Sequence, residues 1–202
     1  MTTKTAPRRR LPRGYRIARN LLGPAELDAA LGAMASEIRS RNPEPDQVAL
    51  IGIRRGGVHL ANRLAKLLAV AGREPPVGIV DITLYRDDLD RVGPNPIVGS
   101  TEIPFEIEGI TVVLVDDVLY TGRTVRAALD ALLDYGRPRG VQLAVLVDRG
   151  HRELPIQPDY AGLREATRPT DQVEVLLAEE GGDDTAVLLE REVAATPGGA
   201  HA

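Results

Sequence analysis

The sequence predicts an α/β protein with a mostly parallel central sheet flanked by helices. Strand and helix signals alternate between residues 24 and 147, and such a succession requires crossover connections between parallel strands. Residues 110–115 form a continuous run rich in β-branched side chains, which is typical of a central parallel strand buried on both faces. The chain shows no internal repeat and no interior linker. One domain is therefore expected.

The first half of the chain supplies helices and short buried strands. Leu27, Leu31, Met34 and Ile38 recur at spacings of three and four and predict a helix from Gly23-Pro24 to about residue 41. A sequence Asn-Pro-Glu-Pro ends this helix. The pattern then predicts a strand at 47–53, a turn at 54–57, a helix at 58–71 and a strand at 77–85.

The second half begins with a polar, aperiodic segment, residues 86–99, which contains Pro94 and Pro96. Loops of this length are usually lids or binding loops. The elements expected after it are a strand at 110–115, a helix at 122–135, a strand at 141–147 and an antiparallel pair at 173–178 and 185–189.

The two ends of the chain are expected to be disordered, which leaves residues 21–192 as the domain. Residues 1–20 hold seven basic residues and no acid, whereas residues 171–192 hold eight acids and one arginine. The basic arm has two interpretations, an RNA-binding extension or a solvated tail. In either case it should lie outside the fold, so that its removal leaves activity unchanged. Residues 193–202 form the second tail.

Composition excludes several classes of function. The 202 residues include no cysteine, which rules out disulfides, thiolate nucleophiles and Cys-ligated metals. Aromatic residues make up 3% of the chain and the net charge is -4, so neither a base-stacking platform nor a global nucleic-acid footprint is expected. No apolar run reaches membrane-spanning length. The expectation is a cytoplasmic protein without a membrane partner.

The stretch 112–124 carries the clearest chemical signal. An apolar strand leads into Asp116 and Asp117, and the turn Thr121-Gly122-Arg123-Thr124 follows before the next helix. Open α/β sheets bind ligands at the carboxyl ends of their strands. Vicinal carboxylates there can accept hydrogen bonds from two ribose hydroxyls, and N–H groups at a helix N-terminus can hold a phosphate. An ordinary helix cap is the alternative, but a cap does not explain two adjacent acids before Thr-Gly-x-Thr.

This stretch resembles the 5-phosphoribosyl-1-pyrophosphate (PRPP) binding motif of the type I phosphoribosyltransferases. Together with residues 81–89 and 142–156, it is similar to the pyrimidine operon regulatory protein (PyrR) family, over about residues 24–190. The resemblance implies a type I phosphoribosyltransferase fold with a small hood and a flexible lid loop at about residues 85–99. It also implies a homo-oligomer, either a dimer or a higher assembly.

The resemblance implies a role for each matching residue. The catalytic group would comprise Arg54, Arg55, Arg86, Asp116 and Asp117. PRPP or nucleotide would be held by Gly56, Val118, Leu119, Tyr120, Thr121, Gly122, Arg123 and Thr124. The nucleobase pocket would involve Arg149, His151 and Val173. RNA contacts would come from Arg39, Arg41 and Arg54.

The resemblance further implies two activities that share one pocket. The first is uracil phosphoribosyltransferase chemistry, in which uracil and PRPP give UMP and pyrophosphate, with Mg²⁺ carried by PRPP rather than by a protein metal site. The second is UMP-responsive binding of leader mRNA from pyrimidine genes, which controls transcription by attenuation. A uracil phosphoribosyltransferase without RNA regulation is an alternative. A purine or orotate enzyme is disfavoured because Tyr120 stands where purine-salvage relatives often carry an acid.

The sequence departs from the family where RNA contacts are expected. Gly32 and Ser36 stand where threonine and histidine are typical, and Gly56 replaces an arginine of the pyrophosphate loop while Arg55 is gained beside it. His151 has two interpretations, a nucleobase contact or a hydrogen-bonded surface residue.

Overall fold

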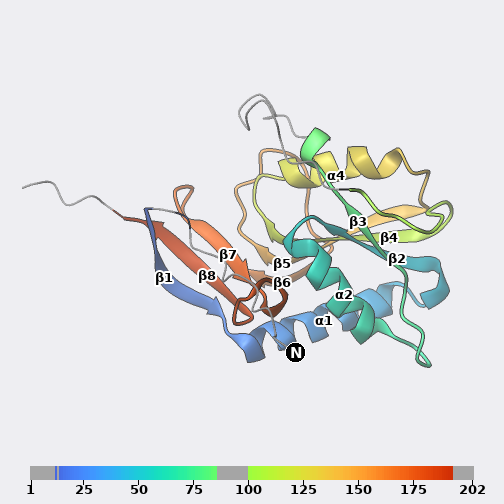
Figure 1. The fold of residues 1–202 in the computed structure, drawn as a ribbon, viewed down its shortest axis with the longest axis horizontal. Coiled ribbons are helices and arrows are strands. Elements are labelled where there is room, and N and C mark those ends of the chain that lie inside the picture. Colours follow the sequence, from blue (N-terminus) through green and yellow to red (C-terminus); the bar gives the residue numbers. More distant parts are fainter. Residues whose placement is uncertain (1–11, 13, 86–99, 193–202) are drawn as a thin grey trace, which may run out of the picture.

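The structure is a computed structural model that describes residue 12, residues 14–85 and residues 100–192. Its centre is a five-stranded parallel sheet with strand order β3-β2-β4-β5-β6 (Figure 1). The strands are β2 (Val48–Ile53), β3 (Val77–Val80), β4 (Thr111–Leu119), β5 (Gly140–Asp148) and β6 (Tyr160–Arg164). The predicted α/β class and parallel sheet are confirmed.

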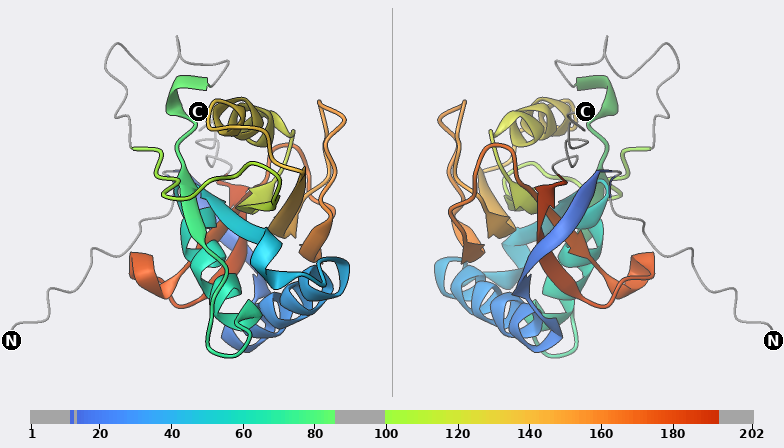
Figure 2. Two further views of the ribbon diagram at one scale, coloured as in Figure 1. Left: turned by 90° about the vertical axis from the view of Figure 1, so that its right-hand side faces the viewer. Right: turned by 90° about the vertical axis from the view of Figure 1, so that its left-hand side faces the viewer.

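Helices cover both faces of this sheet, as Figures 1 and 2 show. The helices are α1 (Pro24–Arg41), α2 (Gly56–Leu68) and α4 (Arg123–Leu133). Successive strand residues point to opposite faces, so Leu50 and Val113 join the core beneath α1 and α2, whereas Ile51 and Leu114 join the core beneath α4. This two-sided burial explains why the central strands are continuous apolar runs.

A second, smaller sheet forms the hood, which we define as the antiparallel sheet of strands in the order β1-β8-β7. Its strands are β1 (Tyr15–Leu22), β7 (Gln172–Leu176) and β8 (Thr185–Arg191). Val175, Leu177 and Leu188 pack into the same core as α1 and α2. The small hood and the late antiparallel pair were both predicted, and both are present.

Three short 3-10 helices complete the described secondary structure: η1 (Pro45–Gln47), η2 (Thr83–Tyr85) and η3 (Ala178–Glu180). Within the described ranges, no helix is long and apolar enough to cross a membrane.

A buried polar network joins the end of α1 to the sheet. Asn42 donates through Nδ2 to the carbonyl of Ile38 at 2.8 Å and to Oε1 of Gln142 at 2.9 Å. The fully buried Tyr160 donates its hydroxyl to the same Oε1 at 2.9 Å. Each of these polar groups therefore finds a partner in the core, as buried polar groups require.

Several sequence-based boundaries were wrong. The strand β1 begins at Tyr15 and pairs with β8 from Tyr15↔Arg191 onward, so residues 15–20 are not a disordered arm. The strand β6 was missed entirely. The strand predicted at 77–85 ends at Val80, whereas β4 extends to Leu119 and so contains both acids. Residues 1–11, 13, 86–99 and 193–202 lie outside the described residues, and the expected lid and tails fall mostly among them.

Candidate functional site

The carboxyl edge of the parallel sheet brings two acids against a glycine loop. Asp116 and Asp117 lie in the last part of β4, and the loop after β2 passes beside them. A Cβ atom at Gly56 would lie 2.2 Å from Oδ2 of Asp117, and one at Gly57 would lie 2.2 Å from the carbonyl oxygen of Val115. Only residues without side chains allow this approach. The packing holds the Asp117 carboxylate directly beside the loop predicted to bind pyrophosphate.

Asp116 is the more enclosed of the two acids. It is buried, and its Oδ1 accepts a hydrogen bond of 3.0 Å from the backbone N–H of Asp117. Burial, and then the neighbouring charge of Asp117, raise the pKa of Asp116 well above its ordinary value. Perturbed carboxylates of this kind concentrate at functional sites.

The turn that leads from β4 into α4, which we call the phosphate turn (residues 121–124), has the features of an anion site. Gly122 caps the helix with a φ of 93°, a left-handed conformation that favours glycine. The N–H of Arg123 donates to the Thr121 hydroxyl at 3.4 Å, and Arg123 forms an ion pair with Glu153. The helix N-terminus and the nearby hydroxyls suit a phosphate.

Not every residue of the predicted phosphate motif points into this turn. The side chain of Leu119 packs into the core beneath α4, and Val118 packs against the core beneath α1 and α2. The carbonyl of Leu119 accepts the N–H of Arg149 at 3.0 Å. The structure therefore gives these two residues a packing role, and Thr121 to Thr124 form the turn itself.

The two arginines of the pyrophosphate loop take different positions. Arg54 donates through Nη2 to the carbonyl of Ser100 at 2.9 Å, and its Nε lies 3.6 Å from Oδ2 of Asp81. Arg55 is exposed at the start of α2. Arg54 thus contacts residues on both sides of segment 86–99, whereas Arg55 faces solvent. Arg86 lies outside the described residues.

An aromatic and cationic stack stands beside the phosphate turn. The guanidinium carbon of Arg149 lies 4.2 Å from the centre of the Tyr120 ring, and the His151 ring meets the same ring edge-on at 5.5 Å. Arg149 is buried, which lowers its pKa, and it donates to the carbonyl of Asp171 at 2.7 Å. The predicted nucleobase residues Arg149 and His151 are therefore brought together on Tyr120.

The His151 ring has a defined hydrogen-bond partner. Its Nε2 lies 2.6 Å from the carbonyl oxygen of Thr167. A carbonyl only accepts, so Nε2 carries the proton, and Nδ1 is the acceptor when the ring is neutral.

A cavity of about 420 Å³ opens between this stack and the hood. Val173, the third predicted nucleobase residue, lines it. The other lining residues are Tyr15, Tyr120, Arg149, Pro169, Thr170, Asp171, Gln172, Glu174 and Arg191. Strands β1 and β8 thus contribute to this wall, although β1 was expected to lie outside the fold.

Arg152 joins several segments of the site by hydrogen bonds, and the sequence analysis did not identify it. Its guanidinium donates to Oδ1 of Asp148 at 2.5 Å and to the carbonyls of Tyr120, Gly150 and Ile156, each at 2.8 Å. These bonds fix the phosphate turn to the loop after β5. The four-residue spacing from Asp148 to Arg152 was visible in the sequence, but a loop has no periodicity that marks such a pair as neighbours.

The arginines predicted to contact RNA lie at two places in the fold. Arg39 donates to the carbonyl of Leu67 at 2.6 Å, and Arg41 lies 5.1 Å from the ring centre of Tyr160 and 3.7 Å from Asp159. Both belong to the last turn of α1, near the start of β2, whereas Arg54 follows the other end of that strand.

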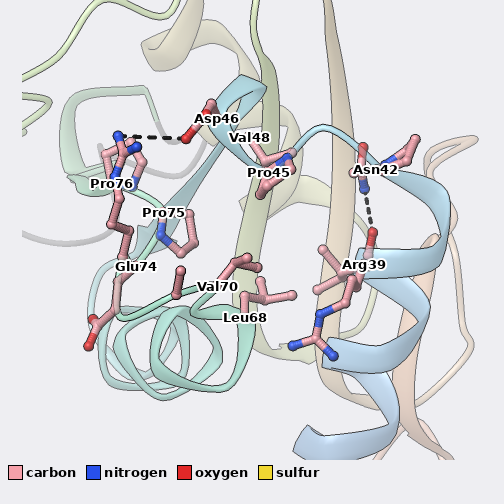
Figure 3. Close-up of a pocket in the computed structure, with 14 residues that line it drawn as sticks. Arg39, Asn42, Pro45, Asp46, Val48, Leu68, Val70, Glu74, Pro75 and Pro76 are labelled. Carbon is pink, nitrogen blue, oxygen red and sulfur yellow. Dashed lines mark hydrogen bonds and ion pairs between the residues drawn. The ribbon is translucent and has the colours of Figure 1, made fainter.

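Arg39 also borders a second cavity of about 560 Å³, between the ends of α1 and α2 (Figure 3). Prolines and aliphatic side chains form most of its wall, and Asp46 and Arg73 pair across its rim at 3.7 Å. It contains none of the residues predicted for PRPP or nucleobase.

Comparisons with known proteins agree with this geometry. The phosphoribosyl transferase domain model matches residues 21–177. The chain is 56% identical over 162 residues to the bifunctional protein PyrR of Pelotomaculum thermopropionicum, which covers 80% of this chain and 90% of the relative. It is 51% identical over 178 residues to the bifunctional protein PyrR of Thermus thermophilus, which covers 88% and 98%.

Solved structures share the fold. A hypoxanthine phosphoribosyltransferase of Staphylococcus aureus matches 89% of this chain and 95% of its own with a TM-score of 0.65 at 18% identity. A purine phosphoribosyltransferase of Pyrococcus horikoshii matches 72% of this chain and 85% of its own with a TM-score of 0.56 at 27% identity.

The fold, the acid pair and the phosphate turn define a phosphoribosyltransferase of the type I class. Within that class, the chain belongs to the PyrR family of bifunctional proteins. The family resemblance drawn from the three sequence motifs is thereby confirmed.

Proposed function

We propose that the protein is a bifunctional pyrimidine regulator, which converts uracil and PRPP to UMP and pyrophosphate and also binds RNA in response to UMP. The observation that carries the enzymatic half is the packing of Asp117 in β4 against Gly56 in the pyrophosphate loop, directly before the phosphate turn at Gly122. One pocket then serves substrate binding and nucleotide sensing alike.

In the proposed reaction, N1 of uracil attacks the anomeric carbon of PRPP as the bond to pyrophosphate breaks, and the N1 proton of uracil passes to water. Asp116 and Asp117 hold the ribose hydroxyls, and Thr121 to Thr124 hold the 5′-phosphate at the N-terminus of α4. Arg55 is exposed beside the loop and supplies positive charge to the leaving pyrophosphate. The residues act by positioning and charge, and no covalent enzyme intermediate is needed.

Mg²⁺ fits this arrangement as part of the substrate. Among the described residues there is no group of three histidine or acidic side chains that could hold a metal ion. Mg²⁺ is commonly bound through one or two carboxylates together with substrate phosphates, and Asp116 and Asp117 are such a pair beside the loop. When bound with PRPP, the ion would neutralise charge on the pyrophosphate group.

The nucleobase wall is proposed to consist of Tyr120, Arg149, His151 and Val173. Arg149 stacks on Tyr120 and donates to the carbonyls of Arg168 and Asp171, just before β7, and these contacts hold this wall in place. We further propose that the protein acts in the cytoplasm as a homo-oligomer and that its RNA partner is the leader of pyrimidine genes.

Phosphoribosyl transfer is tested by incubating the purified protein with PRPP, Mg²⁺ and uracil, orotate or hypoxanthine in parallel, and by following nucleotide formation chromatographically. The expected result is UMP formation from uracil alone. Turnover of orotate or hypoxanthine with no reaction of uracil would overturn the substrate assignment.

A uracil phosphoribosyltransferase without RNA regulation is the second candidate. The observation in its favour is that Arg39 bonds to Leu67 and Arg41 contacts Tyr160 and Asp159. Both arginines end α1, near the start of β2, whereas Arg54 follows the other end of β2. Binding of the leader RNA, measured with and without UMP across a salt series, separates the two. Tight binding strengthened by UMP supports the regulator, and weak, salt-labile binding that ignores UMP supports the enzyme alone.

A further inference from the structure

An ionic contact joins the hood to the helix that carries the pyrophosphate loop. Arg63 of α2 donates through Nε to Oε1 of Glu179 at 2.9 Å and through Nη2 to Oε2 of the same carboxylate at 2.6 Å. Its Nη2 also donates to Oδ1 of Asp184 at 2.6 Å. The two-point geometry on Glu179 is the strong and directional form of an arginine–carboxylate pair.

This contact holds the whole turn at the tip of the hood, and its two carboxylates are partly exposed to water. The Arg63 side chain is 18% exposed, and its hydrogen bond holds the pKa of Glu179 below its usual range. Glu179 follows β7 and Asp184 precedes β8, so one guanidinium holds both ends of their connection. Asp184 also accepts the N–H of Ala178 at 2.9 Å, which closes the turn on itself.

Each partner leads directly to one wall of the site. Arg63 lies two turns along α2 from Gly56, a distance of about 10 Å along the helix axis, and Gly56 is fixed against Asp117. In the hood, β7 runs back from this turn to Val173, which lines the cavity beside Tyr120. The contact therefore joins the PRPP wall and the nucleobase wall through two rigid elements.

We propose that Arg63 is a positioning residue for phosphoribosyl transfer, because its bonds to Glu179 and Asp184 set the separation between the nucleobase wall and the pyrophosphate loop. This inference rests on the proposed transferase activity. The attacking nitrogen must approach the anomeric carbon in line with the leaving group, and a displacement of about 1 Å in such a geometry lowers rates about 100-fold. The residues proposed to hold PRPP lie on β4, at the start of α4 and in the pyrophosphate loop, and Arg63 is not one of them.

The test compares Arg63→Met with wild type at a temperature where both are folded, using steady-state kinetics and calorimetric titration of PRPP. We expect kcat/KM for uracil to fall about 10- to 100-fold, with the Kd for PRPP changed by less than about twofold. Arg63→Lys keeps the charge but not the two-point bond, and we expect it to recover part of the loss. Arg73→Met is the matched control, since Arg73 and its partner Asp46 are each 80% exposed, and it should leave both quantities unchanged.

Three outcomes would overturn the proposal. One is a folded Arg63→Met with wild-type kcat/KM, which would leave the contact with a stabilising role only. Another is an equal loss in PRPP affinity and in turnover, which would place the effect in the pyrophosphate loop instead of the hood. If Arg63→Met does not fold, Glu179→Gln replaces it in the test, because this substitution removes the charge of Glu179 and keeps the shape of its side chain. The third overturning outcome is then wild-type kinetics in Glu179→Gln.

The failure of the proposed function looks different. In that case the wild-type protein forms no UMP from uracil and PRPP, so there is no transferase activity to compare between the variants.

Discussion

Gly56→Ala should weaken PRPP binding by displacing the Asp117 carboxylate. A Cβ atom at position 56 would lie 2.2 Å from Oδ2, 2.6 Å from Cγ and 2.9 Å from Cβ of Asp117. Such distances are not tolerated, so the Asp117 side chain has to leave its place. Gly56 does not have a positive φ, so alanine fits the backbone of α2. The substitution therefore acts through the displaced carboxylate.

The size of the effect follows from the contact that is lost. A hydrogen bond to a charged group contributes about 1.5–3 kcal/mol, and each 1.4 kcal/mol corresponds to about a tenfold change in affinity. Losing the proposed bond between Asp117 and a ribose hydroxyl should therefore weaken PRPP binding about 10- to 140-fold. The free energy of unfolding should fall as well, because the Cβ of Asp117, 2.9 Å from the added atom, can move only with the backbone of β4.

The measurement is calorimetric titration of PRPP with Mg²⁺, accompanied by a denaturant melt of the same sample. Gly32→Ala provides the matched control. Gly32 is an exposed helix glycine with no atom within 4 Å of an added Cβ, so the substitution should stabilise the protein by up to about 1 kcal/mol and leave PRPP affinity unchanged. Wild-type affinity in a well-folded Gly56→Ala would refute the assignment of Asp117 to the ribose.

Three further outcomes are expected. Asp116→Asn should weaken PRPP binding in calorimetry about 10- to 140-fold yet raise Tm at pH 8. The folded-state pKa of Asp116 is raised, so its ionisation destabilises the fold as pH rises above about 4. The gain in Tm should vanish at pH 3, and an unchanged Tm at pH 8 would contradict this reasoning. Deleting residues 1–20 removes most of β1 and the Tyr15 wall, so Tm and UMP formation should both fall, and wild-type values of both would count against the pairing of β1 with β8. Asn42→Ala leaves Gln142 and Tyr160 short of a partner and should lower the free energy of unfolding by about 1–3 kcal/mol in urea melts, while equal melts would show that water replaces the amide.

Local sequence patterns predicted the elements in which buried residues recur at the regular spacing of a helix or a strand. The helix α1 was predicted at its observed bounds because Leu27, Leu31, Met34 and Ile38 all face the core. The central strand β4 was recognised because it is buried on both faces. The phosphate turn follows that strand directly and contains the glycine cap Gly122, so it could be predicted from contiguous sequence alone.

Elements held by distant partners were not predictable in the same way. The strand β1 is an exposed edge strand in which Ile17 is 50% exposed, so it has no alternating apolar face, and its pairing with β8 holds most of its length in place. The strand β6 is five residues long and contains Gly162, whose added Cβ would meet the carbonyl of Leu146 at 2.9 Å. Its strand character comes from close packing on β5, which the sequence does not display.

The site was predicted by motif and corrected by geometry. Asp116, Asp117 and the phosphate turn came from contiguous sequence, and the structure brings them together with Gly56. Contacts made across long sequence separations, such as Arg63 with Glu179, carry no local signal. The placement of Arg39 and Arg41 away from Arg54 likewise depends on the direction of α1 relative to β2.

The pairing of β1 with β8 has a consequence for how the chain acquires its fold. Among the described strands, β1 is made first during synthesis, and its partner β8, which places Arg191 opposite Tyr15, is made last. The parallel sheet up to β6 can assemble earlier, whereas the first strand must wait unpaired with one edge open. Contacts of such high sequence separation form slowly, and unpaired edges invite association with other chains. Nascent or truncated chains that lack β8 should therefore depend on chaperones more than the finished protein does.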